Sequence, residues 1–459
     1  LITNSSYTAQ KSKNNLPDKI FIKTFGCQMN EYDSDRIRDL TTNNGFINST
    51  DYKNSDCFII NTCHIREKAT EKVFHEIGRI KKNFKNKKKP IVVIAGCVAQ
   101  AEGEILLQRE KYIDAVIGPQ SYHTINDIIK SIETKKKQHE LTNFNTIEKF
   151  DELKLIKNKN SKISSFLTVQ EGCDKFCKFC VVPYTRGPEH SRNFEDIIKE
   201  ADQLILNGSR EITLIGQNVN AYQYKNKRLS DLIIKLNEKK ELKRIRYTTS
   251  HPKDFTEDLI EIHKNCKKLM PLIHLPVQSG SNKILEAMNR KHTVEEYLKI
   301  CKKLLKVKPE IKFSSDFIVG YPGETNDDFK NTIKLVNQIG FINTFSFMFS
   351  ARPGTPAYDL VRVDKSEAKN RLIKFQSIAE DIKTSYRKSL INKTVNVLFE
   401  NSMKKENRYF GRDEHFNAVI VQSNQDLTGK IKNVKIIKGN QNTLYGEIIL
   451  NLDQTNYAA

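Results

Sequence analysis

Short runs of apolar residues alternate with longer segments of helical character in the first third of the chain. The apolar runs occupy residues 20–25, 57–60, 91–94 and 115–117, and the helical segments occupy residues 33–42, 69–84, 102–110 and 125–132. This alternation is typical of a parallel sheet with helices on both faces, because parallel strands need a crossover connection. We therefore predict a doubly wound parallel α/β domain over residues 19–140.

Two flanking segments lack this pattern. Residues 1–18 are polar and aperiodic, which predicts a loose N-terminal tail. Residues 141–162 are charged and also aperiodic, which predicts a linker between two domains.

The alternation of strands and helices resumes near residue 163 and continues for six units. The predicted strands occupy residues 166–169, 212–215, 245–248, 272–275, 313–319 and 344–349, and a long helical segment follows at 366–389. Six parallel β/α units build an open partial barrel, in which active sites lie at the carboxyl ends of the strands. We predict this domain over residues 163–390.

The pattern changes once more after residue 390. Short alternating strands are predicted at residues 394–399, 416–421, 434–437 and 444–450, separated by polar turns. They indicate a small antiparallel β-barrel over residues 391–459. Aromatic and basic residues interleave at 404–412, as contacts to RNA bases and phosphates require. The segment holds nine Lys and Arg against seven Asp and Glu, so its charge alone does not identify an RNA-binding module.

The whole chain is basic. Its 459 residues include 76 Lys and Arg against 55 Asp and Glu, a formal net charge of +21, which favours a partner with a phosphate backbone. No apolar run reaches transmembrane length, so we expect no membrane partner. The nine cysteines are not spread as pairs, which favours a reducing compartment, and we expect a cytoplasmic protein. Nothing in the sequence requires more than a monomer.

The most specific chemical signal is a loop that contains Cys173, Cys177 and Cys180. Structural zinc requires four ligands, and no second cysteine pair lies nearby to complete such a site. Three thiolates instead suit a cubane [4Fe-4S] cluster, in which they bind three irons and leave the fourth open. The alternative, three inert thiols, does not account for the Cys-x3-Cys-x2-Cys spacing.

Three more cysteines, Cys27, Cys63 and Cys97, each follow one of the first three apolar runs. The carboxyl ends of parallel strands share one edge of an open α/β sheet, so these residues are expected to converge. One interpretation is three packed thiols at strand ends. Their equivalent placement favours the other interpretation, a second three-cysteine cluster with an open iron.

Several strings of residues resemble those of the radical S-adenosylmethionine (SAM) methylthiotransferase family, along nearly the whole chain. The matching strings are residues 26–30, 33–34, 61–63, 65–69, 96–100, 173–187, 274–281 and 352–357. The resemblance implies that the three N-terminal cysteines hold an auxiliary [4Fe-4S] cluster and that the three loop cysteines hold the [4Fe-4S] cluster that cleaves SAM. The C-terminal segment is loosely similar to the family's TRAM domain, an RNA-binding module.

The strand-end loops of the predicted barrel are polar and rich in glycine. Each is either an ordinary turn or a source of backbone and amide hydrogen bonds to SAM. We assign Gln217, Asn218, Gln278 and Gly320 as candidate SAM-binding residues.

The resemblance also implies a reaction and its partners. The enzyme would add a methylthio group to C2 of N6-isopentenyl(dimethylallyl)adenosine at position 37 of tRNAs that read codons beginning with U. One SAM molecule would methylate sulfur, and a second would supply the radical that removes hydrogen from C2. The implied partners are the anticodon stem-loop of the tRNA and donor proteins for sulfur and electrons, which the sequence does not identify.

Two rival interpretations keep part of this picture. Relatives with the same chemistry modify an aspartate of a ribosomal protein or a threonylcarbamoyl-adenosine in tRNA, but their first cysteine motif has Pro-Lys or a Lys where this chain has Gln28 and Met29. The other rival is an iron-sulfur protein that only binds RNA or carries electrons. Such a protein would shield each cluster with four cysteines and has no need of a six-unit barrel.

Overall fold

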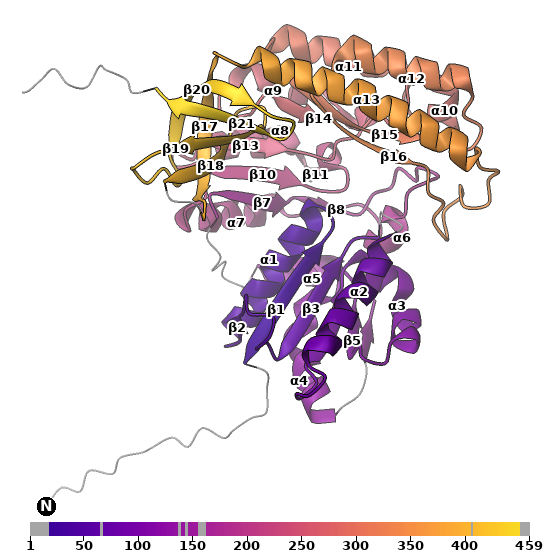
Figure 1. The fold of residues 1–459 in the computed structure, drawn as a ribbon, viewed down its shortest axis with the longest axis vertical. Helices are drawn as coiled ribbons and strands as arrows, with labels where there is room; N and C mark the ends of the chain where they lie inside the picture. The colour runs from indigo at the N-terminus through magenta and orange to yellow at the C-terminus, as the bar shows by residue number, and fades with distance from the viewer. Residues whose placement is uncertain are drawn as a thin grey trace, which may run out of the picture.

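The computed structural model describes residues 18–64, 68–135, 139–142, 146–154, 162–404 and 407–449. The predicted tail therefore lies outside the described residues except for Asp18, and so do residues 143–145 and 155–161 of the predicted linker. Figure 1 shows the N-terminal domain below, the large α/β domain above it, and a small β-barrel beside the large domain.

The N-terminal domain is a six-stranded parallel sheet with the strand order β2-β1-β3-β4-β5-β6. Its strands are β1 (Lys19–Phe25), β2 (Ile47–Asn48), β3 (Cys57–Thr62), β4 (Ile91–Ala95), β5 (Ala115–Ile117) and β6 (His139–Leu141), and its helices are α1 (Gln28–Asn43), α2 (Lys68–Asn83), α3 (Cys97–Arg109) and α4 (Ile125–Lys135). Helices α1 and α4 cover one face of the sheet, and α2 and α3 cover the other. β3 is apolar along most of its length because its side chains are buried on both faces. The doubly wound sheet is thus confirmed.

The segment predicted as a linker contains regular structure in its described part. Helix α5 (Thr146–Leu153) lies within it, and Phe150 and Leu153 pack into the core shared by α1 and α4. Lys149 on the same helix is fully buried. The charged composition had suggested an exposed linker, but at least one of these charges, Lys149, is paired inside the protein with Glu171.

The large domain is a partial barrel of six parallel strands in two three-stranded halves, β13-β10-β7 and β14-β15-β16. The strands are β7 (Ser164–Thr168), β10 (Glu211–Ile215), β13 (Arg244–Tyr247), β14 (Leu272–His274), β15 (Lys312–Val319) and β16 (Asn343–Met348). A parallel bridge between Ile245 and Leu269 joins the two halves. The expected six-unit barrel is confirmed.

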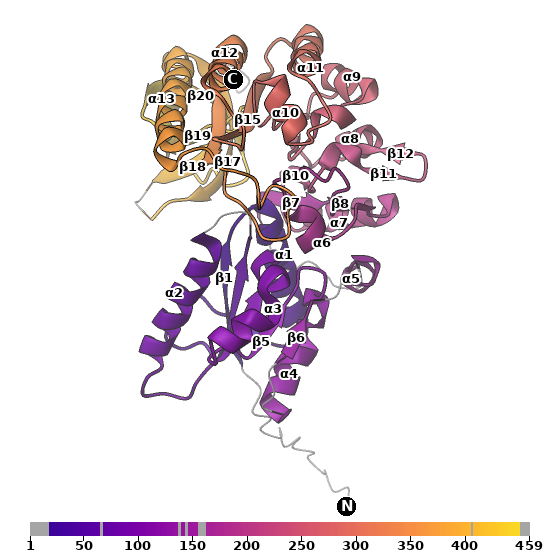
Figure 2. The same cartoon turned by 90° about the vertical axis from the view of Figure 1, so that its right-hand side faces the viewer.

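Helices cover the outer face of this barrel (Figure 2). They are α7 (Phe194–Leu206), α8 (Leu229–Asn237), α9 (Glu257–Asn265), α10 (Asn282–Ala287), α11 (Val294–Val307), α12 (Asn326–Ile339) and α13 (Lys365–Ser389); short elements at the strand ends are β8 (Gln170–Glu171), α6 (Val182–Arg186), β9 (His190–Ser191), β11 (Gln223–Tyr224) and β12 (Lys227–Arg228). Capping boxes begin α11 at Thr293 and α12 at Thr325, which satisfies backbone donors that the first helical turn leaves free.

The C-terminal domain is a closed five-stranded barrel in the order β17-β18-β19-β21-β20. Its strands are β17 (Thr394–Ser402), β18 (Arg408–Arg412), β19 (Ala418–Gln422), β20 (Ile431–Gly439) and β21 (Thr443–Ile448). The pair β19 and β21 is parallel, whereas the other four pairs are antiparallel. The small barrel is confirmed, although β18 was not among the predicted strands.

The three domains are held together by buried contacts. Met29 and Tyr32 on α1 pack against Phe166 and Ile215 on the inner face of the large barrel. On β13, Arg244 and Arg246 donate hydrogen bonds to backbone carbonyl groups of the C-terminal barrel. No helix within the described ranges is long and apolar enough to cross a membrane.

The buried imidazole of His263 on α9 makes folding sensitive to acid. Its Nε2 lies 2.8 Å from the Tyr247 hydroxyl, and burial lowers the pKa of His263 from 6.5 to about 3. A group whose pKa is depressed in the folded state stabilises the protein above its unfolded pKa and loses that contribution as the pH falls toward the folded pKa.

We therefore expect the free energy of unfolding of the wild type to fall between pH 6.5 and pH 5 more steeply than that of His263→Gln, by up to about 1.4 kcal/mol per pH unit, and the thermal unfolding midpoint to fall more steeply with it. Differential scanning fluorimetry across this range measures the slopes. Equal slopes would mean that His263 does not contribute to the acid sensitivity.

Candidate functional site

The structure brings Cys27, Cys63 and Cys97 to one edge of the N-terminal sheet. Cys27 precedes the first residue of α1, Cys63 follows β3, and Cys97 is the first residue of α3. Cys27 is exposed at the sheet edge, and a hydrogen bond with the Cys63 thiol lowers the pKa of Cys27 to about 6. Burial raises the pKa of Cys97, and the Arg186 guanidinium beside it partly offsets this effect.

The backbone and two asparagines around these thiols are packed closely. The Asn30 side-chain amide donates to Asn61 Oδ1 at 2.9 Å, and Cys27 Sγ lies 3.3 Å from Asn30 Oδ1. Gly96 has a φ of 91°, and a Cβ atom there would lie 2.3 Å from Asn61 Oδ1. The chain therefore requires glycine at this position, and the two asparagines fix the turns that carry the cysteines.

The second group of cysteines lies in the loop between β8 and α6. Burial raises the pKa of Cys173 to about 11 and that of Cys180 to about 12. Two donors point at the sulfurs: Arg290 Nη1 lies 3.5 Å from Cys177 Sγ, and the backbone NH of Val182 lies 3.5 Å from Cys180 Sγ. Such donors favour anionic sulfur, as thiolate ligands of a metal centre require.

The two sets of three cysteines fit [4Fe-4S] clusters better than single metal ions. Among the residues that the structure describes, no three His, Cys, Asp or Glu side chains gather closely enough to hold one ion. A cubane makes a different demand, because each of three thiolates binds its own iron. Each site supplies three cysteines, the number of thiolates that such a cluster uses, and an arginine donor lies beside one sulfur at each site.

The four residues assigned to SAM lie in loops around the Cys173 loop. Gln217 Oε1 accepts a hydrogen bond from the backbone NH of Gly172 at 2.7 Å. Asn218 donates to Asp254 at 2.7 Å, and its buried Oδ1 has no hydrogen-bond partner. Their contact with SAM stays a prediction.

The other two assigned residues have backbone conformations that are rare outside turns. Gln278 has a φ of 78°, and its backbone NH donates to Asp316 O at 3.0 Å. Gly320 has a φ of 71°, and its backbone NH donates to a Glu324 carboxylate oxygen. A left-handed φ in a non-glycine residue is costly, which marks Gln278 as a constrained position at the barrel mouth.

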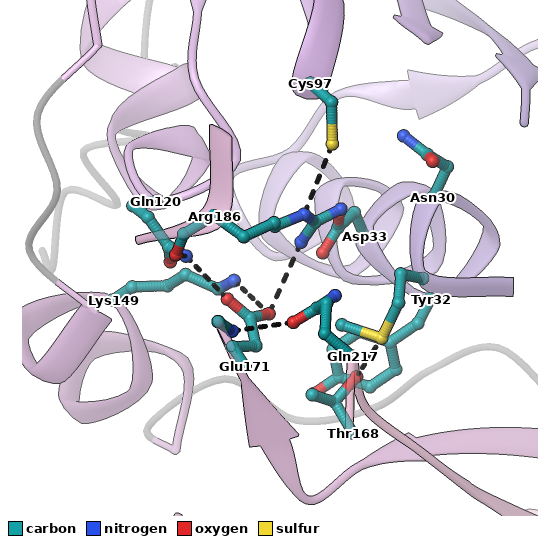
Figure 3. Close-up of polar contacts among 12 residues, drawn as sticks. Asn30, Tyr32, Asp33, Cys97, Gln120, Lys149, Thr168, Glu171, Arg186 and Gln217 are labelled. Atoms are coloured by element: carbon teal, nitrogen blue, oxygen red, sulfur yellow. Dashed lines mark hydrogen bonds and ion pairs between the residues drawn. The ribbon is translucent and has the colours of Figure 1, made fainter. Parts of the chain in front are cut away.

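A buried network of charged side chains contacts Cys97 at one cysteine site and contains Glu171, two residues before Cys173 of the other site (Figure 3). Arg186, at the end of α6, donates from Nε to Cys97 Sγ at 3.4 Å and from Nη2 to Asp33 Oδ2 at 2.6 Å. Its Nη1 lies 3.5 Å from Glu171 Oε1, which also pairs with Lys149 Nζ at 2.5 Å. Sequence reasoning assigned no role to these charged residues.

The network keeps its charges balanced. Burial alone would raise the pKa of Glu171, but Lys149 and Arg186 outweigh burial, and the pKa is lowered below its ordinary value. Gln120 Nε2 donates to Glu171 Oε2 at 2.8 Å and to the carbonyl oxygen of Arg186 at 2.9 Å. Asp33 and Arg186 lie within strings that resembled the family, which was the only sequence signal for them.

Three protein-family models match this chain in succession. The model described as uncharacterized protein family UPF0004 matches residues 19–118, the radical SAM superfamily model matches residues 167–336, and the TRAM domain model matches residues 388–449. The radical SAM match spans most of the six-unit barrel and includes the second cysteine loop.

Solved structures with this fold have low sequence identity to the chain. A radical SAM methyltransferase, TsrM from Kitasatospora setae, aligns with a TM-score of 0.56 and 13% identity, covering 74% of this chain and 75% of that one. The cobalamin-dependent SAM radical enzyme OxsB aligns with a TM-score of 0.50 and 13% identity, covering 80% of this chain and 56% of that one. At this identity the likeness concerns the fold alone.

Curated relatives match over almost their full length. A tRNA-2-methylthio-N(6)-dimethylallyladenosine synthase of Pelagibacter ubique (strain HTCC1062) is 59% identical over 434 residues, which cover 94% of this chain and 97% of the relative. The enzyme of the same name from Ruegeria pomeroyi is 45% identical over 436 residues, covering 94% and 99%. The chain belongs to the tRNA-2-methylthio-N(6)-dimethylallyladenosine synthase family of radical SAM enzymes.

Proposed function

We propose that this protein adds a methylthio group to C2 of N6-isopentenyladenosine at position 37 of tRNAs that read codons beginning with U. The names of relatives that are 45% to 59% identical support this activity. The structural observation that carries it is the presence of two separate three-cysteine sites, with one buried network that contacts Cys97 of the first and contains Glu171, two residues before Cys173 of the second. A radical SAM enzyme with one cluster would need only one such site.

We propose that Cys27, Cys63 and Cys97 hold the auxiliary cluster and that the Cys173 loop holds the cluster that binds SAM. When bound, SAM and the two [4Fe-4S] clusters supply a carbon-centred radical and a sulfur donor, which an aromatic C–H bond without useful acidity requires. The domains that we propose are residues 19–140, 163–390 and 391–459; residues 141–162 join the first two, and helix α5 within them packs against the first. The three matched family models support this division.

We propose that SAM is held by Gln217, Asn218, Gln278 and Gly320. Gln217 and Asn218 follow β10 after the single residue Gly216, and the buried, unpartnered Oδ1 of Asn218 offers an acceptor. Gln278 and Gly320 lie at the carboxyl ends of neighbouring strands, where ligands of such barrels bind, and since their NH groups are bound within the protein they would accept hydrogen bonds through carbonyl oxygens.

The inner face of β14, β15 and β16 is the surface that we propose for the modified base. Asp316 on β15 is in register with Phe345 on β16, and the ring of Phe345 meets His274 edge-on at 5.9 Å. Phe345 and Phe347 are 45% and 38% exposed, although they lie in a strand of the barrel. An exposed aromatic surface suits a purine that carries an apolar isopentenyl group.

The C-terminal barrel is proposed to bind the tRNA backbone. Within the basic and aromatic segment of β18, the Arg412 guanidinium lies over the rings of Phe410 and Phe416 and pairs with Glu400. These contacts orient Arg412 rather than leave it free, while Arg408 is exposed. We also propose a monomer in the cytoplasm, where it would meet tRNA and its donors of sulfur and electrons.

The proposal is tested by anaerobic reconstitution with iron and sulfide, followed by reaction with an anticodon stem-loop and mass spectrometry of the digested nucleosides. A stem-loop with N6-isopentenyladenosine at position 37 should yield the 2-methylthio nucleoside, and the same stem-loop with adenosine should not. Product on a threonylcarbamoyl-adenosine or on a protein aspartate, and none on the prenylated RNA, would favour the rival relatives.

The double variant Phe345→Ala, Phe347→Ala should bind the prenylated stem-loop roughly tenfold more weakly, because stacking on an aromatic ring contributes about 1–3 kcal/mol per base. Fluorescence anisotropy measures the dissociation constants. Ile373→Ala on α13 removes a side chain that is also exposed, at 55%, and is the matched control that should bind normally. Unchanged binding by the double variant would place the base elsewhere.

A further inference from the structure

The network around Arg186 connects parts of the chain that are far apart in sequence. Asp33 comes from α1, Lys149 from α5, Glu171 from β8 and Arg186 from α6. The side chains of all four charged residues are at most 2% exposed. Two acids and two bases are therefore enclosed together where the N-terminal domain meets the large barrel (Figure 3).

Each end of the network reaches one cysteine site. At one end, Arg186 Nε contacts Cys97 Sγ. At the other end, Glu171 is two residues before Cys173, and the intervening Gly172 is bound through its NH to Gln217. A displacement of the Arg186 side chain would thus change the contacts of Cys97 at one site and of Glu171, next to the other site.

The geometry is not explained by stability alone. Removing charged groups from water costs desolvation free energy, and replacing a buried ion pair with apolar residues often leaves stability unchanged or increases it. A buried ion pair can instead fix one arrangement of the segments that carry it, because separating the two side chains would leave each charge buried without its partner. The planar guanidinium of Arg186 contacts Cys97, Asp33 and Glu171 at the same time. A lysine ammonium at the end of a flexible chain would not reproduce these three contacts.

We propose that Arg186 is a positioning residue that holds the auxiliary site at a fixed separation and orientation from the SAM-cleaving site. This inference rests on the proposed function, because it assumes that both cysteine sites carry clusters. The positive charge of Arg186 beside Cys97 also favours the reduced, more negative state of a cluster bound there.

The test compares Arg186→Gln with the wild type after anaerobic reconstitution. We expect the variant to keep about eight irons per chain and to cleave SAM to 5′-deoxyadenosine within a few-fold of the wild-type rate. The methylthiolated product formed per deoxyadenosine should fall roughly tenfold or more, since the separation of the two sites is no longer fixed. Electrochemical titration should give a more negative reduction potential for the auxiliary cluster, and electron paramagnetic resonance should show altered spin coupling between the reduced clusters.

Arg36→Gln is the matched control. Arg36 is also buried and pairs with Asp39 at 3.1 Å within α1, and its Nη2 donates to the carbonyl oxygen of Leu153. Loss of this pair should destabilise the same domain but leave the potential, the spin coupling and the product ratio unchanged. Arg186→Lys, which keeps the charge, should recover part of the potential but less of the product ratio.

Gln120→Leu is a milder variant for the case in which Arg186→Gln does not fold. It removes the hydrogen bonds to Glu171 and to the Arg186 carbonyl and keeps every charge, so it should lower the product ratio with little change in potential. An unchanged ratio and unchanged spin coupling in whichever variant folds would overturn the proposal. Absence of methylthiolation in the wild type would instead count against the proposed function, and the potential and spin coupling would still test the role of Arg186.

Discussion

Replacing Cys27, Cys63 and Cys97 together by alanine should lower the iron content from about eight to about four atoms per chain and abolish methylthiolation. The three thiols converge at one sheet edge, so their loss removes every sulfur ligand that we propose for that site. The cysteines of the other loop are contributed by a different domain and stay in place. Cleavage of SAM should therefore persist, although the cleavage no longer leads to product.

The chain offers a matched control for this variant. Cys57, Cys266 and Cys301 are buried in the hydrophobic cores, apart from both sites, and their triple alanine variant should keep about eight irons. Iron and sulfide analysis and the yield of 5′-deoxyadenosine are the measurements. About four irons both in the wild type and in the triple variant at Cys27, Cys63 and Cys97 would mean that these cysteines bind no cluster and are structural. The sulfur chemistry would then need another explanation.

The fold could be predicted because its strands are buried on both faces. β3, for example, is enclosed by two layers of helices, so its sequence is nearly continuous in apolar residues and recognisable without its neighbours. The strand β18 has no such signal. It closes a small barrel with the residues Arg-Tyr-Phe-Gly-Arg, and its place is determined by pairing with β17 and β19.

Helix α5 was missed for a related reason. Its charged sequence suggested exposure, but Lys149 is enclosed because Glu171 lies 2.5 Å from its ammonium group. Such a pairing joins residues that are 22 positions apart in sequence, and local composition carries no information about it. A charged segment is an exposed linker only where its charged side chains are solvated by water and are not paired with buried groups elsewhere in the chain.

The candidate site divides in the same way. The cysteines could be assigned from spacing and from their position after strands, because those features are local, and their role as cluster ligands stays a prediction. Arg186 could not be assigned a partner, since nothing in its neighbourhood in the sequence indicates that its side chain reaches Cys97. The residues that connect two sites are set by how domains pack, which local patterns do not encode.

Replacing Cys173, Cys177 and Cys180 by alanine should give the complementary result, with SAM cleavage reduced below detection and about four irons retained. The reason is that SAM is proposed to bind at this loop, whose sulfurs receive hydrogen bonds from Arg290 and from the NH of Val182. Without the sulfurs these donors have no anionic partner, and no other cysteine among the described residues of the barrel lies in a strand-end loop.

The complementary pair of variants also tests whether the two sites are independent. If each triple variant keeps about four irons, each set of cysteines binds its own cluster, and mixing the two variants should not restore product, because both sites must lie across one Arg186 network in the same chain. Product in the mixture would mean that the sites cooperate between chains. Loss of all iron in the Cys173 variant would mean that the auxiliary site forms only when the loop is already occupied, and the buried network would then be the route by which one site depends on the other.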